Sequence, residues 1–320
     1  MNLQQLRYLA EVAGRDLNLS RAADALHTSQ PGISRQIRLL EEELGTELLV
    51  RQGNRIAALT QPGHEAVAIA RRALREIENL RTLGEDASRG GQGRLVIATT
   101  HAHARYVLIP IVRRYQAAWP DVSLGIRQGH PDQIVDWVQA GEADIGLCTD
   151  PTRTMPELAR LPCYKLARCV LVPAGHALLK KRRPALADLA RFPMITLDQA
   201  FAAGVTVLGA FARAGLSPRV VLSATDADVI KAFVAAGVGI ATLPEIAFDA
   251  RRDKGLARIA ARHLFEPSVS SVWLHRHHYQ RRLAAAFVQL LSPAWTPERV
   301  QQALRSTQAP DDRTAVDLTA

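Results

Sequence analysis

In the amino-terminal region, the residues best suited to chemistry are polar side chains on one face of a predicted helix. Gln30, Ser34, Arg35 and Arg38 recur at helical spacing, opposite the apolar positions of the same segment. Arginine pairs bidentately with guanine and glutamine with adenine, so such a face can contact base edges in a DNA major groove. A polar face that carries arginine is also the ordinary surface of a solvated helix. The face by itself therefore leaves both interpretations open.

Residues around this face suit a DNA backbone. Thr28 and Ser29 offer short donors to phosphates, and Pro31 with the glycine after it keeps this end of the helix slim enough for a groove. Arg51 and Arg55 flank a predicted hairpin turn, from which they could contact backbone phosphates or a minor groove. Together with the helical face, these residues are the predicted DNA-binding set.

Threonines at predicted strand-to-helix corners form a second candidate site. Thr99 and Thr100 end a strand and enter a helix, Thr149 ends another strand, and Thr225 with Asp226 begins a later helix. Hydroxyls and backbone N–H groups converge at such corners, where an anion is favoured. Each corner taken alone is more often a helix cap than a ligand site. The convergence of several corners on one cleft is what favours anion binding.

The histidines and catalytic motifs offer weaker chemistry. His275, His277 and His278 have no carboxylate or cysteine nearby in the sequence, which is poor ligand chemistry, so no metal site is expected. No P-loop, dinucleotide-binding glycine fingerprint or nucleophile elbow is present. His101 and Asp226 could pair in space, but no nucleophile accompanies them. We expect neither an enzyme nor a cofactor.

Composition indicates a globular protein of two or three units. The chain has 320 residues, of which 48% are hydrophobic and 22% charged, and its net charge is +9. Residues 1–92 hold 12 arginines, no lysine and 12 acidic residues, so the positive excess lies in residues 93–320. Bulk charge therefore does not locate a DNA-binding end.

The cellular compartment is also predicted from the sequence. The first residues carry charge within an apolar pattern and lack the features of a signal peptide, and no segment approaches membrane-spanning length. The chain has three cysteines, Cys148, Cys163 and Cys169, and they lack CxxC spacing. This favours buried thiols in a reducing cytoplasm over redox sensors. We expect a cytoplasmic protein.

Short helices and a hairpin must position the amino-terminal set. A helix over residues 19–26 is followed within a few residues by another that Ser29 caps and Gly45 ends. Residues 48–50 and 56–59 then form a predicted strand pair. Two helices joined by a tight turn and followed by a hairpin are the winged variant of helix-turn-helix.

The rest of the chain divides into a long helix and an α/β region. One side of the helix carries an apolar stripe without a nearby partner, which predicts dimerisation: Val67, Ala70, Leu74, Ile77 and Leu80. After a glycine-rich hinge at 89–93, strands and helices alternate in two blocks, and the last segments return to the first block. The expected α/β architecture is a winged helix-turn-helix (1–60), a linker and dimerisation helix (61–88), a two-lobe, periplasmic-binding-protein-like effector domain (89–305) and a disordered tail (306–320).

Residues 19–63 resemble the signature of the LysR-type regulators. They contain paired alanines at 22–23, Ser-Gln-Pro at 29–31, a leucine-glutamate helix end and an arginine-bearing wing, without a gap. The resemblance extends to about residue 300 and is greatest to the CysB subfamily, which includes alkanesulfonate regulators. The segments that carry it are 97–101, 104–106, 128–129, 161–164 and 224–231.

The resemblance also implies an effector site, with departures from the subfamily pattern. Thr100 and Thr149 match the pattern. Ala102 and His103 stand where the pattern has threonine and glutamine, and Ala202 stands where it often has threonine. The predicted cleft has lost hydroxyl donors and gained an imidazole. His103 either contacts an anion or is simply exposed, and the sequence leaves both open.

The function that the resemblance implies is transcriptional regulation of sulfur assimilation genes, for cysteine biosynthesis or for use of sulfate or alkanesulfonates. The expected partners are double-stranded operator DNA, a small anionic effector such as sulfate, adenosine phosphosulfate or O- or N-acetylserine, RNA polymerase if the protein activates, and further copies of the chain in a tetramer. One alternative is a LysR-type regulator of an unrelated pathway. A solute-binding protein is a remote alternative, because the fused helix-turn-helix and the missing export signal disfavour it.

Overall fold

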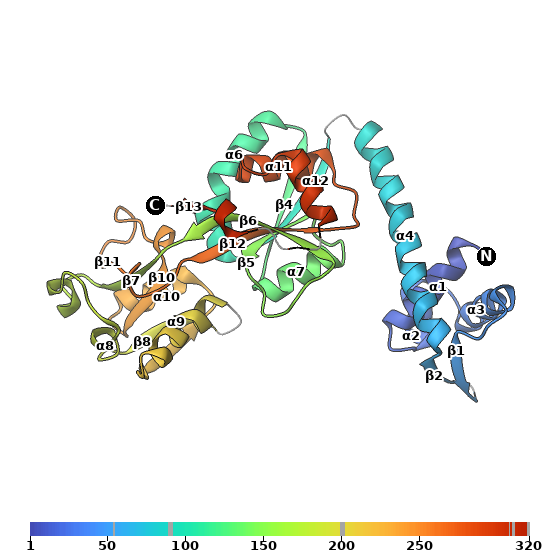
Figure 1. Cartoon of the computed structure of the whole chain (residues 1–320), viewed down its shortest axis with the longest axis horizontal. Helices are drawn as coiled ribbons and strands as arrows, with labels where there is room; N and C mark the ends of the chain where they lie inside the picture. Colours follow the sequence, from blue (N-terminus) through green and yellow to red (C-terminus); the bar gives the residue numbers. More distant parts are fainter. Residues whose placement is uncertain (54, 89–91, 199–201, 307, 309–310, 319–320) are drawn as a thin grey trace. The chain divides into compact units, whose positions relative to one another are not determined.

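The computed structural model describes residues 1–320 except 54, 89–91, 199–201, 307, 309–310 and 319–320, and describes only the backbone at 55, 85, 202 and 203 (Figure 1). Tertiary contacts divide the chain into two compact units, Met1–Ser88 and 89–320, called here the amino-terminal and the carboxy-terminal unit. Each unit has hydrophobic clusters of its own, as an independent fold requires.

Three helices build the core of the amino-terminal unit: α1 (Leu3–Gly14), α2 (Leu19–Ala25) and α3 (Gln30–Leu44). The side chains of Asn18 and Ser29 cap α2 and α3, and Gly45 ends α3 with a left-handed φ of 66°. Ile33 and Ile37 are fully buried among the three helices. The predicted helix-turn-helix is therefore present, with the opposite face of α3 left free.

A hairpin and a long helix complete this unit. Strands β1 (Leu49–Gln52) and β2 (Arg55–Leu59) pair antiparallel, and α4 covers Gln61–Ser88. Val67 and Ala70 of the predicted dimerisation stripe are buried, and Val67 belongs to the helix-turn-helix core, where α4 packs against α1. Part of the stripe thus has a partner within the unit, and the structure shows no division between residues 60 and 61.

The first sheet of the carboxy-terminal unit has six strands, in the order β13 (Val316–Leu318), β6 (Leu158–Leu166), β12 (Ser268–His275), β5 (Ile145–Thr149), β3 (Gly93–Thr99) and β4 (Val122–Gln128). Strands β3, β4 and β5 are parallel, and β12 is antiparallel to β5. One face is covered by α6 (Ile109–Ala118), α11 (Arg282–Leu291) and α12 (Pro297–Arg305), and the other by α7 (Pro131–Gln139) (Figure 1). This sheet and its helices form lobe I.

The second sheet has five strands, in the order β11 (Leu256–Ala260), β7 (Arg168–Pro173), β10 (Ile240–Pro244), β8 (Met194–Leu197) and β9 (Val220–Ala224). Helices α8 (Leu186–Leu189) and α9 (Ala202–Arg213) pack on one face, and α10 (Ala227–Ala235) packs on the other. This sheet and its helices form lobe II.

The chain crosses between the lobes twice. Ala167 alone separates β6 of lobe I from β7 of lobe II, and the chain returns between β11 and β12. The predicted return of the late segments to the first block is therefore confirmed. Because both crossings are short, the corners at the ends of the strands in the two lobes face a common region.

The prediction of a disordered tail over 306–320 is wrong for the residues that the structure describes. Val316–Leu318 forms β13, which pairs in parallel with β6, and Arg160 Nη1 donates to Asp312 Oδ1 at 2.5 Å. The polar composition of the tail suggested disorder. Strand β6 would otherwise be the edge of its sheet, and its unpaired backbone groups accept an added strand.

Candidate nucleic-acid interface and effector cavity

The free face of α3 lies beside a groove of the amino-terminal unit. Six of the nine predicted DNA-binding residues line this groove: Gln30, Pro31, Ser34, Arg35, Arg38 and Arg51. Arg35 and Arg38 are exposed and form no ion pair with another described residue, so their guanidinium groups are available to a polyanion. Helical spacing within α3 brings five of these side chains together, and Arg51 joins them from the hairpin.

The remaining predicted DNA contacts have varied surroundings. Thr28 and Ser29 are exposed just before α3, and Ser29 Oγ accepts the backbone N–H of Gly32 at 3.3 Å as the helix cap. The side chain of Arg55 and the predicted turn residue Asn54 lie outside the described residues. Backbone donors at this exposed helix start can still face a phosphate.

Arg51 has a structural partner. Its Nη2 donates to Glu41 Oε2 at 2.6 Å, and Glu41, which is only 8% exposed, also accepts the backbone N–H groups of Leu48 and Leu49 through Oε1. This carboxylate ties the end of α3 to the start of the hairpin. A phosphate contact by Arg51 would therefore compete with this ion pair.

A cavity of about 50 Å³ lies between the two lobes of the carboxy-terminal unit. Lobe I contributes the segment 100–103 together with Thr149, Leu166 and Ser268, and lobe II contributes Arg168, Leu197, Thr225, Ala227, Pro244 and Ile246. Five of the seven predicted effector residues line it: Thr100, Ala102, His103, Thr149 and Thr225. The corners at the strand ends therefore converge on one cavity.

Of the two remaining predicted effector residues, Thr99 is not among the described residues that line the cavity. Thr99 is fully buried, and its hydroxyl donates to the carbonyl of Leu147 at 2.8 Å, which stitches β3 to β5. The side chain of Ala202 lies outside the described residues.

His103 is buried rather than exposed. Thr100 Oγ1 lies 2.6 Å from its Nδ1, and Ser270 Oγ lies 2.6 Å from its Nε2, so both ring nitrogens already have hydrogen-bond partners. Burial lowers the pKa of His103 to about 4. The ring is therefore neutral at physiological pH, and it orients Thr100 instead of offering a positive charge.

The sequence analysis missed Arg168. This residue begins β7, is 1% exposed and lines the cavity, and its Nη2 donates to Ser268 Oγ at 2.6 Å. One signal was present in the sequence: Arg168 stands among residues of types that are usually buried, such as Leu166 and Cys169.

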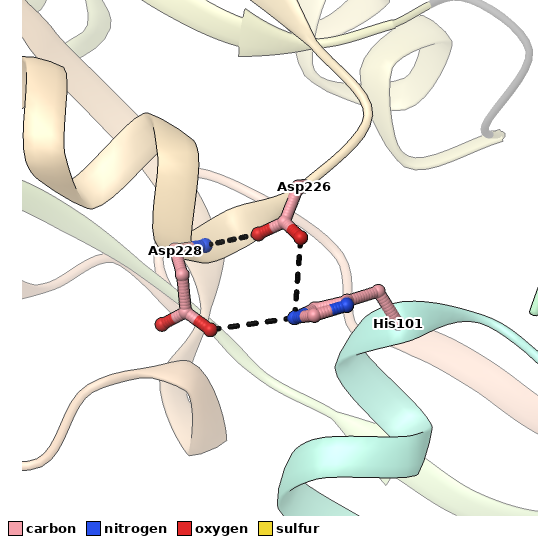
Figure 2. A group of neighbouring side chains, drawn as sticks. All are labelled: His101, Asp226 and Asp228. Atoms are coloured by element: carbon pink, nitrogen blue, oxygen red, sulfur yellow. Dashed lines mark hydrogen bonds and ion pairs between the residues drawn. The ribbon is translucent and has the colours of Figure 1, made fainter.

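A polar network lies next to the cavity (Figure 2). His101 of the short helix α5 (His101–His103) points toward the start of α10, where its Nε2 lies 3.1 Å from Asp226 Oδ2 and 3.4 Å from Asp228 Oδ2. The predicted pairing of His101 with Asp226 is confirmed. Arg105 Nε also donates to Asp228 at 2.8 Å, from a π turn (Ala104–Leu108) that follows α5. The network joins lobe I to lobe II.

Asp228 is held as an anion by several donors. Burial raises the pKa of Asp228, but hydrogen bonds from Lys231 and Tyr106 outweigh burial and lower it to about 2. Lys231 Nζ lies 2.8 Å from Asp228 and 3.0 Å from Asp253. Asp228 is therefore already paired with two cations, Arg105 and Lys231.

Among the described residues, His101, Asp226 and Asp228 form one group whose ligand atoms lie close enough to hold a metal ion. A divalent cation there would have to displace Arg105 and Lys231 from Asp228. This donor set fits an ion-pair network better than a metal centre.

The other candidate histidines and the cysteines have structural surroundings. The buried ring of His275 stacks on His278 at a centroid distance of 3.7 Å, and His277 Nε2 lies 3.5 Å from Glu157. All three cysteines are buried free thiols, as predicted. Burial raises the pKa of Cys163 and of Cys169 to about 12 and that of Cys148 well above its usual range, which disfavours thiolate chemistry.

Two family models match the two units. Residues 3–64 match the bacterial regulatory helix-turn-helix protein of the lysR family, and residues 88–296 match the LysR substrate binding domain. The chain belongs to the LysR family. It is accordingly a DNA-binding transcriptional regulator with a domain for a small-molecule effector.

Curated relatives of this LysR regulator match it over nearly the whole chain. The HTH-type transcriptional regulator CysB of Burkholderia cenocepacia is 42% identical over 305 residues, which cover 95% of this chain and 97% of that protein. SsuR of the same species is 39% identical, with coverage of 95% and 99%. The regulator Cbl of Escherichia coli is 38% identical, with coverage of 94% and 96%.

Solved structures have the same fold. The cofactor-binding domain of the Cbl transcriptional regulator is 35% identical with a TM-score of 0.64, covering 67% of this chain and 95% of that one. Full-length CbnR in complex with its target DNA is 25% identical with a TM-score of 0.54, covering 91% and 99%. Among the described residues of this LysR regulator, no helix combines the length and apolarity needed to cross a membrane.

Proposed function

We propose that this LysR regulator controls sulfur assimilation genes, for cysteine biosynthesis or for use of sulfate or alkanesulfonates, in response to a small anionic effector. The observation that carries the proposal is that Thr100 and Thr149, which match the CysB pattern, line one cavity at strand ends. Candidate effectors are sulfate, adenosine phosphosulfate and O- or N-acetylserine. Near full-length identity to CysB and SsuR supports the choice of pathway.

DNA binding uses the groove beside α3. Arg35 and Arg38 are exposed on the face of α3 opposite its buried isoleucines, which suits contact with base edges in the major groove. Thr28, Ser29 and the wing residue Arg55 contact phosphates, and these contacts fix register without reading sequence.

The functional form is an oligomer, a tetramer, built on dimers of α4. Ile69, Leu80 and Leu83 are exposed by 55%, 66% and 44% on this helix, although Val67 and Ala70 are buried. Exposed leucines and isoleucine at helical spacing favour pairing with a second copy. The protein acts in the cytoplasm and contacts RNA polymerase where it activates.

The chain is not an enzyme and needs no cofactor. His101 and Asp226 pair, but among the described residues both belong to an ion-pair network with Asp228, Arg105 and Lys231, so neither is poised as a base for a nucleophile.

The main alternative is a LysR regulator of another pathway with a different effector. The neutral, fully engaged His103 and the methyl group of Ala102 favour it, since they remove donors that the CysB pattern supplies. A bound anion loses about 1.5–3 kcal/mol of binding free energy for each charge-assisted hydrogen bond that its oxygens do not receive.

Sequencing the DNA that the purified full-length protein captures from its own genome tests the pathway. We expect sites upstream of sulfur assimilation genes, with occupancy that changes when sodium sulfate replaces sodium chloride at equal ionic strength. Capture of sites beside unrelated genes would favour the alternative.

A further inference from the structure

Arg168 carries a buried charge that the fold does not neutralise. Its Nη2 donates to Ser268 Oγ at 2.6 Å, but its Nε and Nη1 are buried with no hydrogen-bond partner among the described residues. Five N–H donors on a side chain that is 1% exposed make this an expensive arrangement. Native structures rarely leave such groups unpaired.

Other buried cations of the same unit are treated differently. Arg160, whose side chain is 14% exposed, pairs with Asp150 and Asp312, and Lys231, at 10%, pairs with Asp228 and Asp253. No carboxylate among the described residues pairs with Arg168. Burial lowers the pKa of Arg168 to about 10, which still leaves it protonated at neutral pH. The fold thus gives two carboxylates to each of these two cations and none among the described residues to Arg168.

The position of Arg168 indicates that a ligand could supply the negative charge that balances its guanidinium group. The residue lines the cavity together with Thr100, Thr149 and Ser268, whose hydroxyls are the neutral donors of the same site. Leu166, Leu197, Pro244 and Ile246 make up much of the remaining wall. The part of a ligand that enters the cavity has room for a few heavy atoms, needs acceptor oxygens and is favoured by a negative charge.

We propose that Arg168 is the charge partner of the effector, and that the effector presents a small oxyanion group, a sulfate, sulfonate or carboxylate, to it. The inference rests on the effector cavity of the proposed function and adds the residue that selects for charge. A guanidinium offers parallel N–H donors that match two oxygens of such a group.

The same residue links the ligand to both lobes. Arg168 begins β7 directly after the first crossing, and Ser268 begins β12 directly after the second. An oxyanion bound by Arg168, by Thr100 of lobe I and by Thr225 of lobe II would bridge the two sheets at their crossings. Binding at this place therefore stabilises one arrangement of the lobes over others.

Titration calorimetry and thermal unfolding of the full-length chain test the proposal. The probes are sodium sulfate, sodium methanesulfonate and sodium acetate, each against sodium chloride at equal ionic strength. The variants are Arg168→Gln and Arg168→Met, with Arg258→Gln as the matched control because Arg258 is an exposed arginine on the neighbouring strand β11. We expect at least one probe to bind the wild type and to raise its melting temperature.

In Arg168→Gln the affinity should fall about 100-fold, the effect of losing two charge-assisted hydrogen bonds. Arg168→Met should unfold in chloride at the same temperature as the wild type or higher, because an unpaired buried charge has been removed, and should show no rise with any probe. Arg258→Gln should behave as the wild type. The probe that binds most tightly identifies the acid group.

Equal binding by the wild type and Arg168→Gln would overturn the proposal, as would failure of all three probes to bind the wild type. Unfolding of both Arg168 variants in chloride would also overturn it, since the residue would then be needed for the fold itself. Binding through Arg168 together with captured DNA beside unrelated genes would refute the pathway and leave this inference standing.

Discussion

The groove beside α3 and the cavity between the lobes are built in opposite ways. The groove residues from Gln30 to Arg38 fall on two to three turns of one helix, and the arginines among them are exposed. The cavity collects residues from Thr100 to Ser268, and several of its polar groups are almost fully buried. An exposed surface can keep unpaired cations at little cost, because water solvates them. A buried site must pair each polar group or reserve it for a ligand.

The largest expected effect concerns the exposed stripe of α4. Leu80→Glu together with Leu83→Glu should give a lower oligomer and weaken operator binding about 1000-fold, because two linked half-sites become independent. Sedimentation velocity and operator titration measure both. Arg81→Ala, a nearby exposed change, is the control, and a double variant with native sedimentation would locate the dimer contact elsewhere.

Glu41 tests whether the exposed groove depends on a buried anchor. Glu41→Ala should destabilise the amino-terminal unit by about 3 kcal/mol, because Arg51 and the N–H groups of Leu48 and Leu49 lose their acceptor. Thermal unfolding and hydrogen exchange at the hairpin report it. Glu42→Ala, an exposed neighbour, should change little. A similar small loss in both variants would contradict the role given to Glu41.

The cavity should respond to pH through His103. Its folded-state pKa, about 4, lies below the ordinary 6.5, so the unfolded chain binds the extra proton first as pH falls. This contribution to stability is complete above pH 6.5 and decreases toward pH 4, by about 2 kcal/mol between pH 7 and pH 5. Urea unfolding at the two pH values should show the loss in the wild type and a smaller one in His103→Gln. The same pH dependence in both proteins would mean that another group is responsible.

Arg35 tests whether the groove beside α3 contacts bases independently of the cavity. Arg35→Ala should cost about 1.5 kcal/mol at the specific operator and relax the base preference at one position. Anion binding by the carboxy-terminal unit should be unchanged. Competition with a library of single-base operator variants measures the preference, and a loss that is uniform across the library would argue against base contact.

The smallest expected effect belongs to Arg55. Arg55→Ala should weaken specific and random DNA alike by less than about 1 kcal/mol and lower the slope of log affinity against log salt by about one. Titrations at several salt concentrations test this. A selective loss at the operator would instead make Arg55 a sequence-reading residue.

Prediction from the sequence succeeded where the deciding interactions are local. Ser29 and Gly45 delimit α3 by capping and left-handed geometry, and both signals are visible in the sequence. The corners at Thr100 and Thr149 were visible for the same reason, since each is the end of a strand. The winged helix-turn-helix, the two lobes and the cavity residues Thr100, Thr149 and Thr225 followed from such signals. Ala102 and His103 followed instead from the resemblance to the CysB pattern.

The tertiary structure decided the properties that depend on burial and on distant neighbours. His103 is neutral because the lobe encloses it and burial disfavours its charged form, while Ser270, far along the chain, lies within hydrogen-bond distance of its second ring nitrogen. Residues 316–318 form a strand because β6 offers an edge, which no local composition reveals. Arg168 reads as one arginine among many until the fold removes it from water without a carboxylate beside it. The electrostatic cost of burying Arg168 arises from desolvation, which only the packed structure imposes. That cost is the reason to infer a bound anion beside it.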